Sequence, residues 1–149
     1  MIVSVDISDA KKLTDIALKS KAFWRYSKED LESWRDDLTI TPKMISKSYI
    51  FKFLIDDVIA GFYFLNPPKQ KSIELEMLFV LPDFIGKGIG KELLHHSFKK
   101  ATELKSTSMT LLADPNAVPF YKSQGFYEVD KKESSIVGRF LPVMKKDLE

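Results

Sequence analysis

A glycine-rich turn near the middle of the chain constrains its fold more than any other feature. An apolar run ends at Pro82, and three glycines at alternate positions, Gly86, Gly88 and Gly90, lead directly into a helical pattern. Glycines let neighbouring backbone N–H groups converge on one point, and a ligand approaches them without meeting a Cβ atom. Because the N-terminal end of the following helix adds partial positive charge, the turn predicts a site for a phosphate or pyrophosphate group.

Two common phosphate-binding loops do not fit these residues. An ATP-type loop requires a glycine five residues before its Gly-Lys-Ser/Thr sequence, but Ile85 occupies that position and Glu92 follows Gly90-Lys91. A dinucleotide-binding loop requires a third glycine at Lys91 or Leu93 and an early place in a βαβ unit. Too little sequence follows the turn to form a nucleotide-binding half-domain.

Two motifs resemble those of the GNAT N-acetyltransferase superfamily. Residues 80–82 read Val-Leu-Pro and precede the turn at 85–90, which is similar to the family's Arg/Gln-x-x-Gly-x-Gly/Ala acetyl-CoA loop. The segment from Asn116 to Phe126 is similar to the family's Asn-x-x-x-Phe-Tyr-x-x-x-Gly-Phe motif. Ile85 departs from the pattern because it stands where the family has Arg or Gln. This contact with the pyrophosphate would be made mainly by the backbone, so the departure weakens cofactor affinity without removing binding.

The resemblance implies acetyl-CoA as the cosubstrate and no metal. Its pyrophosphate would lie on the turn, and main-chain groups near Val80 would bind pantetheine and polarise the thioester carbonyl. Helix capping by Asn116 and core packing by Phe120 are the alternatives to direct contact with the cofactor. The residues expected to form this site are Phe79, Val80, Ile85, Gly86, Lys87, Gly88, Ile89, Gly90, Lys91, Asn116 and Phe120.

Acetyl transfer to an amine also requires proton transfer. The departing thiolate needs an acid, and Tyr121 matches the family's general-acid tyrosine; the alternative is a core tyrosine with its hydroxyl at the rim. The attacking amine needs a base, and Glu74 falls where some family members place a glutamate, with Glu76 as the second candidate. Solvated or lysine-paired carboxylates are the alternative for both. Strand alternation predicts that these two acids share a face with Leu78 and Val80.

The rest of the pattern predicts an α/β (α+β) domain with the GNAT fold. We expect strands at 2–7, 48–55, 58–65, 72–81, 107–112, 126–131 and 136–143, and helices from Ser8, over 28–38, from Gly88 and over 115–123. Asp56-Asp57 predicts the two-residue turn of a hairpin, and Thr41-Pro42 is expected to end the second helix. The order is β-α-α-β-β-β-α-β-α-β-β, with about seven strands in a mixed, mostly antiparallel sheet and about four helices. The resemblance implies that strands 73–81 and 107–112 splay apart to admit pantetheine. Residues 1–149 would form a single domain.

Composition narrows the class of function. A net charge of +2 with acids and bases mixed gives no reason to expect nucleic-acid binding, and the absence of cysteine excludes disulfides, thiolate metal sites and a cysteine nucleophile. Without a signal-peptide pattern or a long apolar run, we expect a cytoplasmic protein with no membrane partner. A homodimer fits the fold, although no residue specifies an interface.

Several further residues have two interpretations. Trp24, Tyr26 and Trp34 lie in a region that forms a wall of the acceptor site in the family, and core packing is the alternative. Arg139 would either face the acceptor cleft and favour a carboxylate or form a surface salt bridge. His95 and His96 are expected to point toward solvent, without a metal.

The function expected from these features is acetyl-CoA-dependent acetylation of a primary amine on a small molecule, by direct attack on the thioester. The first alternative is acetylation of a protein lysine or N-terminus. The second is a non-catalytic module that binds acyl-CoA.

Overall fold

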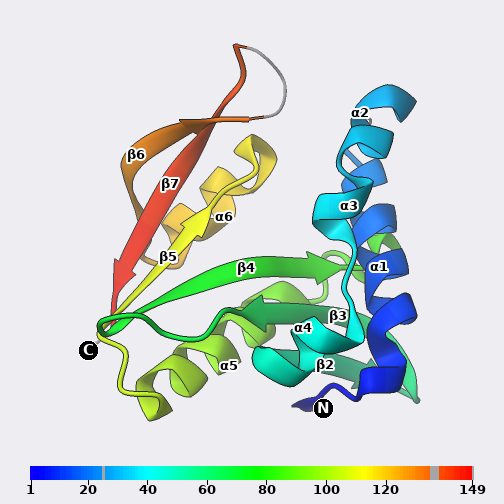
Figure 1. The fold of residues 1–149 in the computed structure, drawn as a ribbon, viewed down its shortest axis with the longest axis horizontal. Coiled ribbons are helices and arrows are strands. Elements are labelled where there is room, and N and C mark those ends of the chain that lie inside the picture. The colour runs from blue at the N-terminus through cyan, green and yellow to red at the C-terminus, as the bar shows by residue number, and fades with distance from the viewer. Residues whose placement is uncertain (25, 135–137, 149) are drawn as a thin grey trace.

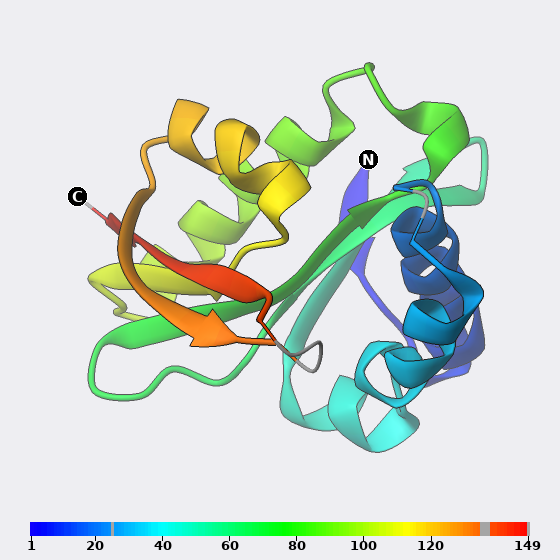
Figure 2. The same cartoon turned by 90° about the horizontal axis from the view of Figure 1, so that it is seen from above.

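The computed structural model describes residues 1–24, 26–134 and 138–148, and these form one seven-stranded sheet with helices on both faces (Figures 1 and 2). The strand order is β1-β2-β3-β4-β5-β7-β6, and every neighbouring pair is antiparallel except β4 and β5. This mixed sheet confirms the predicted fold class. The strands are β1 (Ile2–Ser4), β2 (Tyr49–Ile55), β3 (Val58–Leu65), β4 (Ser72–Val80), β5 (Ser108–Leu112), β6 (Tyr127–Glu133) and β7 (Phe140–Asp147).

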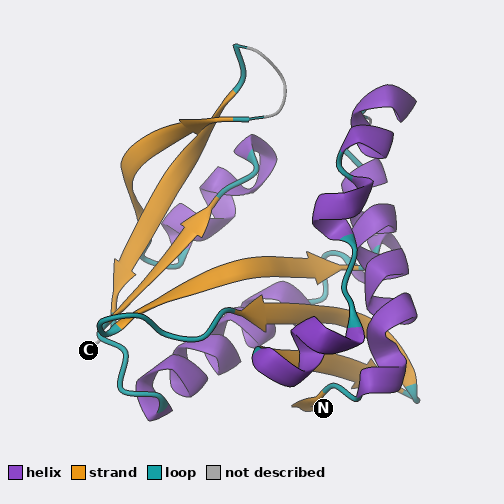
Figure 3. Cartoon of the chain, in the orientation of Figure 1, coloured by secondary structure: helices purple, strands orange, loops and turns teal. Residues whose placement is uncertain are grey.

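Two groups of helices enclose the sheet (Figure 3). Four pack on one face and two on the other, and each group covers its own cluster of buried apolar side chains. The first group is α1 (Ala10–Ala22), α2 (Lys28–Ser33), α3 (Arg35–Leu38) and α4 (Pro42–Lys47). The second is α5 (Ile89–Glu103) and α6 (Val118–Ser123), and short 3-10 turns lie at η1 (Ile7–Asp9), η2 (Pro82–Phe84) and η3 (Pro115–Ala117).

The hairpin of β2 and β3 forms at the predicted place. Asp56 and Asp57 make its two-residue turn, with φ angles of 48° and 66°. Two consecutive left-handed residues are typical of the turn type whose twist matches that of paired strands, and aspartate tolerates this conformation.

Four predicted boundaries differ from the structure. Helix 28–38 is two helices that meet at Trp34, and α1 begins at Ala10 because Asp6 caps a 3-10 turn before it. Thr41 does not end a helix but begins one: its side chain accepts a hydrogen bond from the Met44 N–H, and Pro42 takes the first position of α4, where its missing N–H costs nothing. The final strand extends to Asp147, and the predicted start of that strand, 136–137, lies outside the described residues.

A β-bulge in β4 changes which of its residues face each side. Leu65 of β3 pairs with Leu75, but the preceding Phe64 pairs with Met77, so Glu76 is an extra residue in the strand. Leu75 belongs to the buried cluster beneath α5, whereas Met77 belongs to the cluster beneath α1.

The predicted faces of this strand are therefore wrong beyond the bulge. Leu78 and Val80 pack against the cluster beneath α5, while Phe79 packs against the cluster beneath α1. Because one extra residue shifts the two-residue period, Glu74 and Glu76 do not share a face with Leu78 and Val80.

The sheet opens between its two parallel strands (Figure 1). Pairing of β4 with β5 begins at Ser72 and Ser108 and ends at Leu75 and Leu111, after which β4 continues to Val80. The two strands diverge where the family resemblance implies a splay. No helix in the described ranges is both long enough and apolar enough to cross a membrane.

Candidate active site

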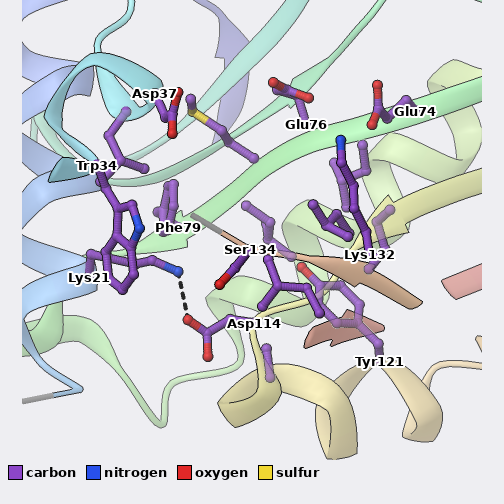
Figure 4. Close-up of a pocket in the computed structure, with 18 of the residues that line it drawn as sticks. Lys21, Trp34, Asp37, Glu74, Glu76, Phe79, Asp114, Tyr121, Lys132 and Ser134 are labelled. Atoms are coloured by element: carbon purple, nitrogen blue, oxygen red, sulfur yellow. Dashed lines mark hydrogen bonds and ion pairs between the residues drawn. The ribbon is translucent and has the colours of Figure 1, made fainter. Parts of the chain in front are cut away.

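A cavity of about 550 Å³ lies where β4 and β5 separate (Figure 4). Residues 74–79 of β4 form one wall, and Leu111 and Leu112 at the end of β5 form another. Side chains from α1, from α3 and from the β6–β7 hairpin complete the enclosure. The cavity therefore spans both halves of the opened sheet.

Backbone groups at the end of β4 point into the gap. The Leu81 N–H donates to a β3 carbonyl at 2.8 Å, so Val80 and Gly61 form a non-hydrogen-bonded pair. The N–H and C=O of Val80 consequently point away from β3, and Ser20 Oγ donates to the Val80 carbonyl at 2.9 Å. Leu78, two residues earlier, has the same orientation. This edge of β4 can hydrogen-bond an extended ligand in the manner of a neighbouring strand.

The glycine turn, residues 85–90, has the backbone conformation of an anion site. Gly86 and Gly88 have φ angles of 87° and 79°, and a Cβ atom on either would meet no atom within 4 Å. The left-handed backbone, rather than crowding, is what requires glycine here, and the space above the turn is open. Lys87 and Lys91 border a surface depression beside Gly88. With α5 beginning at Ile89, the turn is suited to a phosphate group.

The remaining glycine of the turn has a different role. A Cβ atom on Gly90 would lie 3.7 Å from Val80 Cγ2 and 3.9 Å from Phe120 Cζ, so the start of α5 packs closely against β4 and α6. Ile89 is buried in the core, whereas Ile85 is exposed, and neither side chain lines the cavity. These two residues can contribute to an anion site only through their backbone.

Tyr121 projects its hydroxyl into the cavity (Figure 4). The residue is only 8% exposed, and among the described residues its hydroxyl has no hydrogen-bond partner. Edge-on contacts with Phe120 and Phe126 hold the ring. Burial, followed by the charge of Asp114, raises the pKa of Tyr121 well above its ordinary value. The phenol therefore stays protonated at neutral pH and can donate a proton inside the cavity.

Glu74 and Glu76 are held together on the opposite side of the cavity. Asn66 Nδ2 donates to Glu74 Oε1 at 2.9 Å and to Glu76 Oε2 at 3.2 Å. Partial burial raises the pKa of Glu76, and the charge of Glu74 raises it further. A carboxylate with a raised pKa is a stronger proton acceptor near neutral pH.

Comparison with known proteins agrees with this geometry. The family model described as an acetyltransferase (GNAT) domain matches residues 22–148. This chain belongs to the GNAT acetyltransferase family. The match covers the turn, both strands of the gap and Tyr121.

Individual relatives of this GNAT protein are similar over different lengths. The uncharacterized N-acetyltransferase ycf52 of Gracilaria tenuistipitata var. liui is 29% identical over 122 residues, which cover 82% of this chain and 62% of that protein. The peptidyl-lysine N-acetyltransferase YjaB of Salmonella typhimurium is 34% identical over 70 residues, 47% of each chain. The chain spans less than two thirds of the length of these curated relatives.

Solved structures share the fold of this GNAT protein. The PaiA N-acetyltransferase of Thermoplasma acidophilum, solved in complex with coenzyme A, superposes with a TM-score of 0.82 at 23% identity. The superposition covers 99% of this chain and 98% of that one.

The GNAT chain also has a polar cluster that the sequence did not predict, here called the clasp: Lys21, Tyr26, Asp114, Asn116 and Arg139. Lys21 Nζ lies 2.6 Å from Asp114 Oδ2, and the Tyr26 hydroxyl donates to the same oxygen at 2.9 Å. Arg139 Nη2 donates to the Tyr26 hydroxyl at 2.7 Å. The clasp thus joins the region of α1 and α2 to the β5–α6 connection and to the start of β7, across the opened sheet.

Electrostatics explain the stability of the clasp. Burial would raise the pKa of Asp114, but the hydrogen bond and charge of Lys21 outweigh it and hold the pKa below its ordinary value. Burial and then Asp114 raise the pKa of Tyr26 to about 12. Asp114 is therefore ionised and Tyr26 neutral at physiological pH.

The structure shows where several residues lie for which the sequence left two interpretations open. The Asn116 side chain donates to Tyr26 at 3.2 Å, and the cap of η3 is Asp114, not Asn116. Arg139 lines the cavity, but its charge faces Asp114 at 3.9 Å. Trp34 is buried in the cluster beneath α1, whereas Trp24 is exposed at the cavity rim.

The histidines of α5 behave differently from each other. His95 is exposed, as expected, and contacts Gln124 at 2.8 Å. The prediction for His96 is wrong, because its Nδ1 lies 2.7 Å from the Tyr63 hydroxyl and its ring packs on Phe51. Both histidines border the depression beside the glycine turn. Within the part of the chain that the structure describes, no three His, Asp or Glu side chains are grouped to hold a metal.

Proposed function

We propose that this GNAT chain transfers an acetyl group from acetyl-CoA to a primary amine by direct attack on the thioester. The observation that carries the proposal is the alignment of three features along one path. The open glycine turn leads to the unpaired edge of β4, and this edge leads to the hydroxyl of Tyr121, which faces the cavity. Each feature matches one part of the reaction: anion binding, alignment of an amide-bearing chain, and proton donation.

The cosubstrate is bound mainly by the backbone in this proposal. N–H groups of the turn, with Lys87 and Lys91 beside them, bind the pyrophosphate. The outward-facing backbone groups of Val80 and Leu78 bind the pantetheine amides, and an N–H there polarises the thioester carbonyl. Phe79, which lines the cavity, supplies apolar contact.

Two side-chain groups move protons in the proposed reaction. The amine nitrogen bonds to the acetyl carbon, the carbon–sulfur bond breaks, and the sulfur takes the proton of Tyr121. Glu76 takes the proton of the amine, because its raised pKa suits a base, and Glu74 stands beside it through Asn66. Asp114 lies near enough to Tyr121 to raise its pKa, which keeps the phenol protonated before transfer.

The acceptor is a small-molecule amine, since the clasp closes one side of the cavity and leaves a bounded space. A protein lysine is the second candidate, favoured by the likeness to a peptidyl-lysine N-acetyltransferase over 47% of the chain. The unpartnered hydroxyl of Tyr121 argues against a module that only binds acyl-CoA. We propose that residues 1–149 act as a single domain, without nucleic acid or membrane partners, and a homodimer is compatible with this site.

The test combines cosubstrate binding with turnover. Acetyl-CoA at about 100 times its dissociation constant should stabilise the fold by about 2.7 kcal/mol, measured as a rise in melting temperature. Thiol release should then be followed across primary amines, amino acids, aminoglycosides and lysine peptides. The absence of both acetyl-CoA binding and thiol release would refute the proposal. Tight acetyl-CoA binding without thiol release for any amine would refute acetyl transfer.

A further inference from the structure

The cavity is acidic although the chain carries a net charge of +2. Five carboxylates line it against three cationic side chains. Two of the cations, Lys21 and Arg139, face Asp114 within the clasp. The remaining cavity wall has four carboxylates and one cation, Lys132.

Three of these carboxylates lie along one side, opposite Asp114 and Tyr121 (Figure 4). They are Glu74 and Glu76, joined by Asn66, and Asp37 of α3, whose charge also contributes to the raised pKa of Glu76. Among described residues none of the three is in an ion pair. Lys132 is the cation on this side, and its charge acts to lower the pKa of Glu76, but three carboxylates outnumber it. The excess of negative charge favours binding of a positively charged ligand.

A second, independent observation identifies this space as a ligand site. Tyr121 is 8% exposed, yet its hydroxyl points into the cavity and has no hydrogen-bond partner among the described residues. The hydroxyl oxygen is not among the fully buried polar atoms without a partner, so it is open to the cavity and available to a group that enters it. The cavity thus has a proton donor on one side and carboxylates on the other.

We propose that the acceptor is a small molecule with two ammonium groups. This inference rests on the proposed transfer reaction and narrows its substrate class. One ammonium gives a proton to Glu76, and its nitrogen then bonds to the acetyl carbon. The carbon–sulfur bond breaks, the sulfur receives the Tyr121 proton, and the second proton lost by the nitrogen returns to the Tyr121 phenolate. The second nitrogen stays protonated and is bound by Asp37. An acceptor with a free carboxylate is disfavoured by the same charges.

The direct test uses two amines of equal length, cadaverine and pentylamine. Both offer a primary amine, and they differ in the second ammonium group. With saturating acetyl-CoA, kcat/KM from thiol release should be about 5-fold higher for cadaverine, the ratio expected for one partly exposed charge pair. Added salt should reduce this ratio, because screening weakens charge pairs at the surface. Equal values, or a preference for pentylamine, would overturn the inference and leave the transfer proposal intact.

A variant pair assigns the effect to Asp37. Asp37→Asn should lower the cadaverine-to-pentylamine ratio several-fold. Asp36→Asn is the matched control, because Asp36 is an exposed neighbour on α3 that does not line the cavity. Equal ratios in Asp37→Asn and the unmodified chain would overturn the assignment.

Binding provides a readout that does not depend on turnover. Calorimetry with the coenzyme A-loaded chain should show tighter binding of cadaverine than of pentylamine. If neither amine is acetylated but cadaverine binds more tightly, the site for two ammonium groups is supported and the proposed transfer fails. If the two amines bind equally, the inference is overturned.

Discussion

The two ends of the cavity are formed by different kinds of group: backbone at one end and side chains at the other. The end that faces the cosubstrate consists of backbone groups from one continuous stretch, 78–90. The acceptor end consists of charged side chains from α1, α3, β4, the β5–α6 connection, β6 and Arg139 just before β7. Most substitutions leave backbone groups unchanged. The cosubstrate end is therefore sensitive to substitution mainly at its left-handed glycines. Single substitutions alter the second end directly. One scaffold can therefore keep its cosubstrate while its acceptor changes.

The largest expected effect tests the backbone end. Gly88→Val forces a β-branched residue into a φ of 79° and places a side chain over the open turn. Acetyl-CoA affinity measured by calorimetry should fall at least about 100-fold. Gly138→Val is the matched control, since Gly138 has a φ of 82° in equally open space far from the turn in sequence. Normal acetyl-CoA affinity in Gly88→Val would refute the role of the turn.

The next effect separates chemistry from binding. Tyr121→Phe removes the only proton donor proposed for the thiolate, so turnover should fall about 100-fold. The acetyl-CoA dissociation constant and the melting temperature should stay nearly constant, because the hydroxyl has no described partner. Exposed Tyr127→Phe serves as the control. Unchanged turnover across the pH range would remove the acid role of Tyr121.

A third substitution tests the side-chain end through stability. Asp114→Asn leaves Lys21 and Arg139 without their carboxylate, at side-chain exposures of 19% and 20%. Urea denaturation should show a loss of about 2–3 kcal/mol, less than for fully buried pairs. The Asp114 pKa is lower in the folded than in the unfolded state, so its contribution is present above pH about 4 and is lost as the pH falls through the folded pKa.

The outcome for Asp114 is checked by two comparisons. In Asp114→Asn, the free energy of unfolding should no longer include the loss that the unmodified chain shows as the pH falls through the folded-state pKa of Asp114. The exposed Asp15→Asn in α1 should retain it. Equal stability of the unmodified chain and Asp114→Asn at neutral pH would show that the clasp does not stabilise the opened sheet.

The smallest effect distinguishes the two neighbouring acids. A base acts when deprotonated, so the rate should fall as pH decreases through the raised pKa of Glu76. Glu76→Gln should remove this acidic limb and lower turnover about 10-fold at neutral pH, whereas Glu74→Gln should retain the limb. The reverse result in pH–rate profiles would transfer the base role to Glu74.

Local features of this protein could be predicted from sequence, and non-local ones could not. The glycine turn and the hairpin at Asp56 depend on conformations that neighbouring residues specify. The bulge at Glu76 depends on the register with Leu65, a contact between separate strands. The clasp joins residues as far apart as Tyr26 and Arg139, and no short pattern encodes it.

One local feature was misread although its pattern was present. Thr41 followed by Pro42 is a good helix start, with a capping side chain and a proline at the first position, as α4 shows. The ion pair of the clasp was not predicted from the sequence, for a different reason. Lys21 and Asp114 are ordinary surface types in sequence, and only the fold brings them within 2.6 Å.

The short parallel ladder has a mechanical consequence for the whole sheet. In the described part of the chain, the ladder between its halves has four residue pairs, from Ser72–Ser108 to Leu75–Leu111, and the N–H groups of Thr107 and Ser108 also donate to the Lys71 carbonyl. With so few hydrogen bonds, resistance to rotation of one half against the other comes mainly from the core beneath α5 and from the clasp. A molecule bound between β4 and β5 beyond Leu75 would hydrogen-bond β4 as a further strand does. The sheet of this protein should therefore become more rigid when the gap is filled.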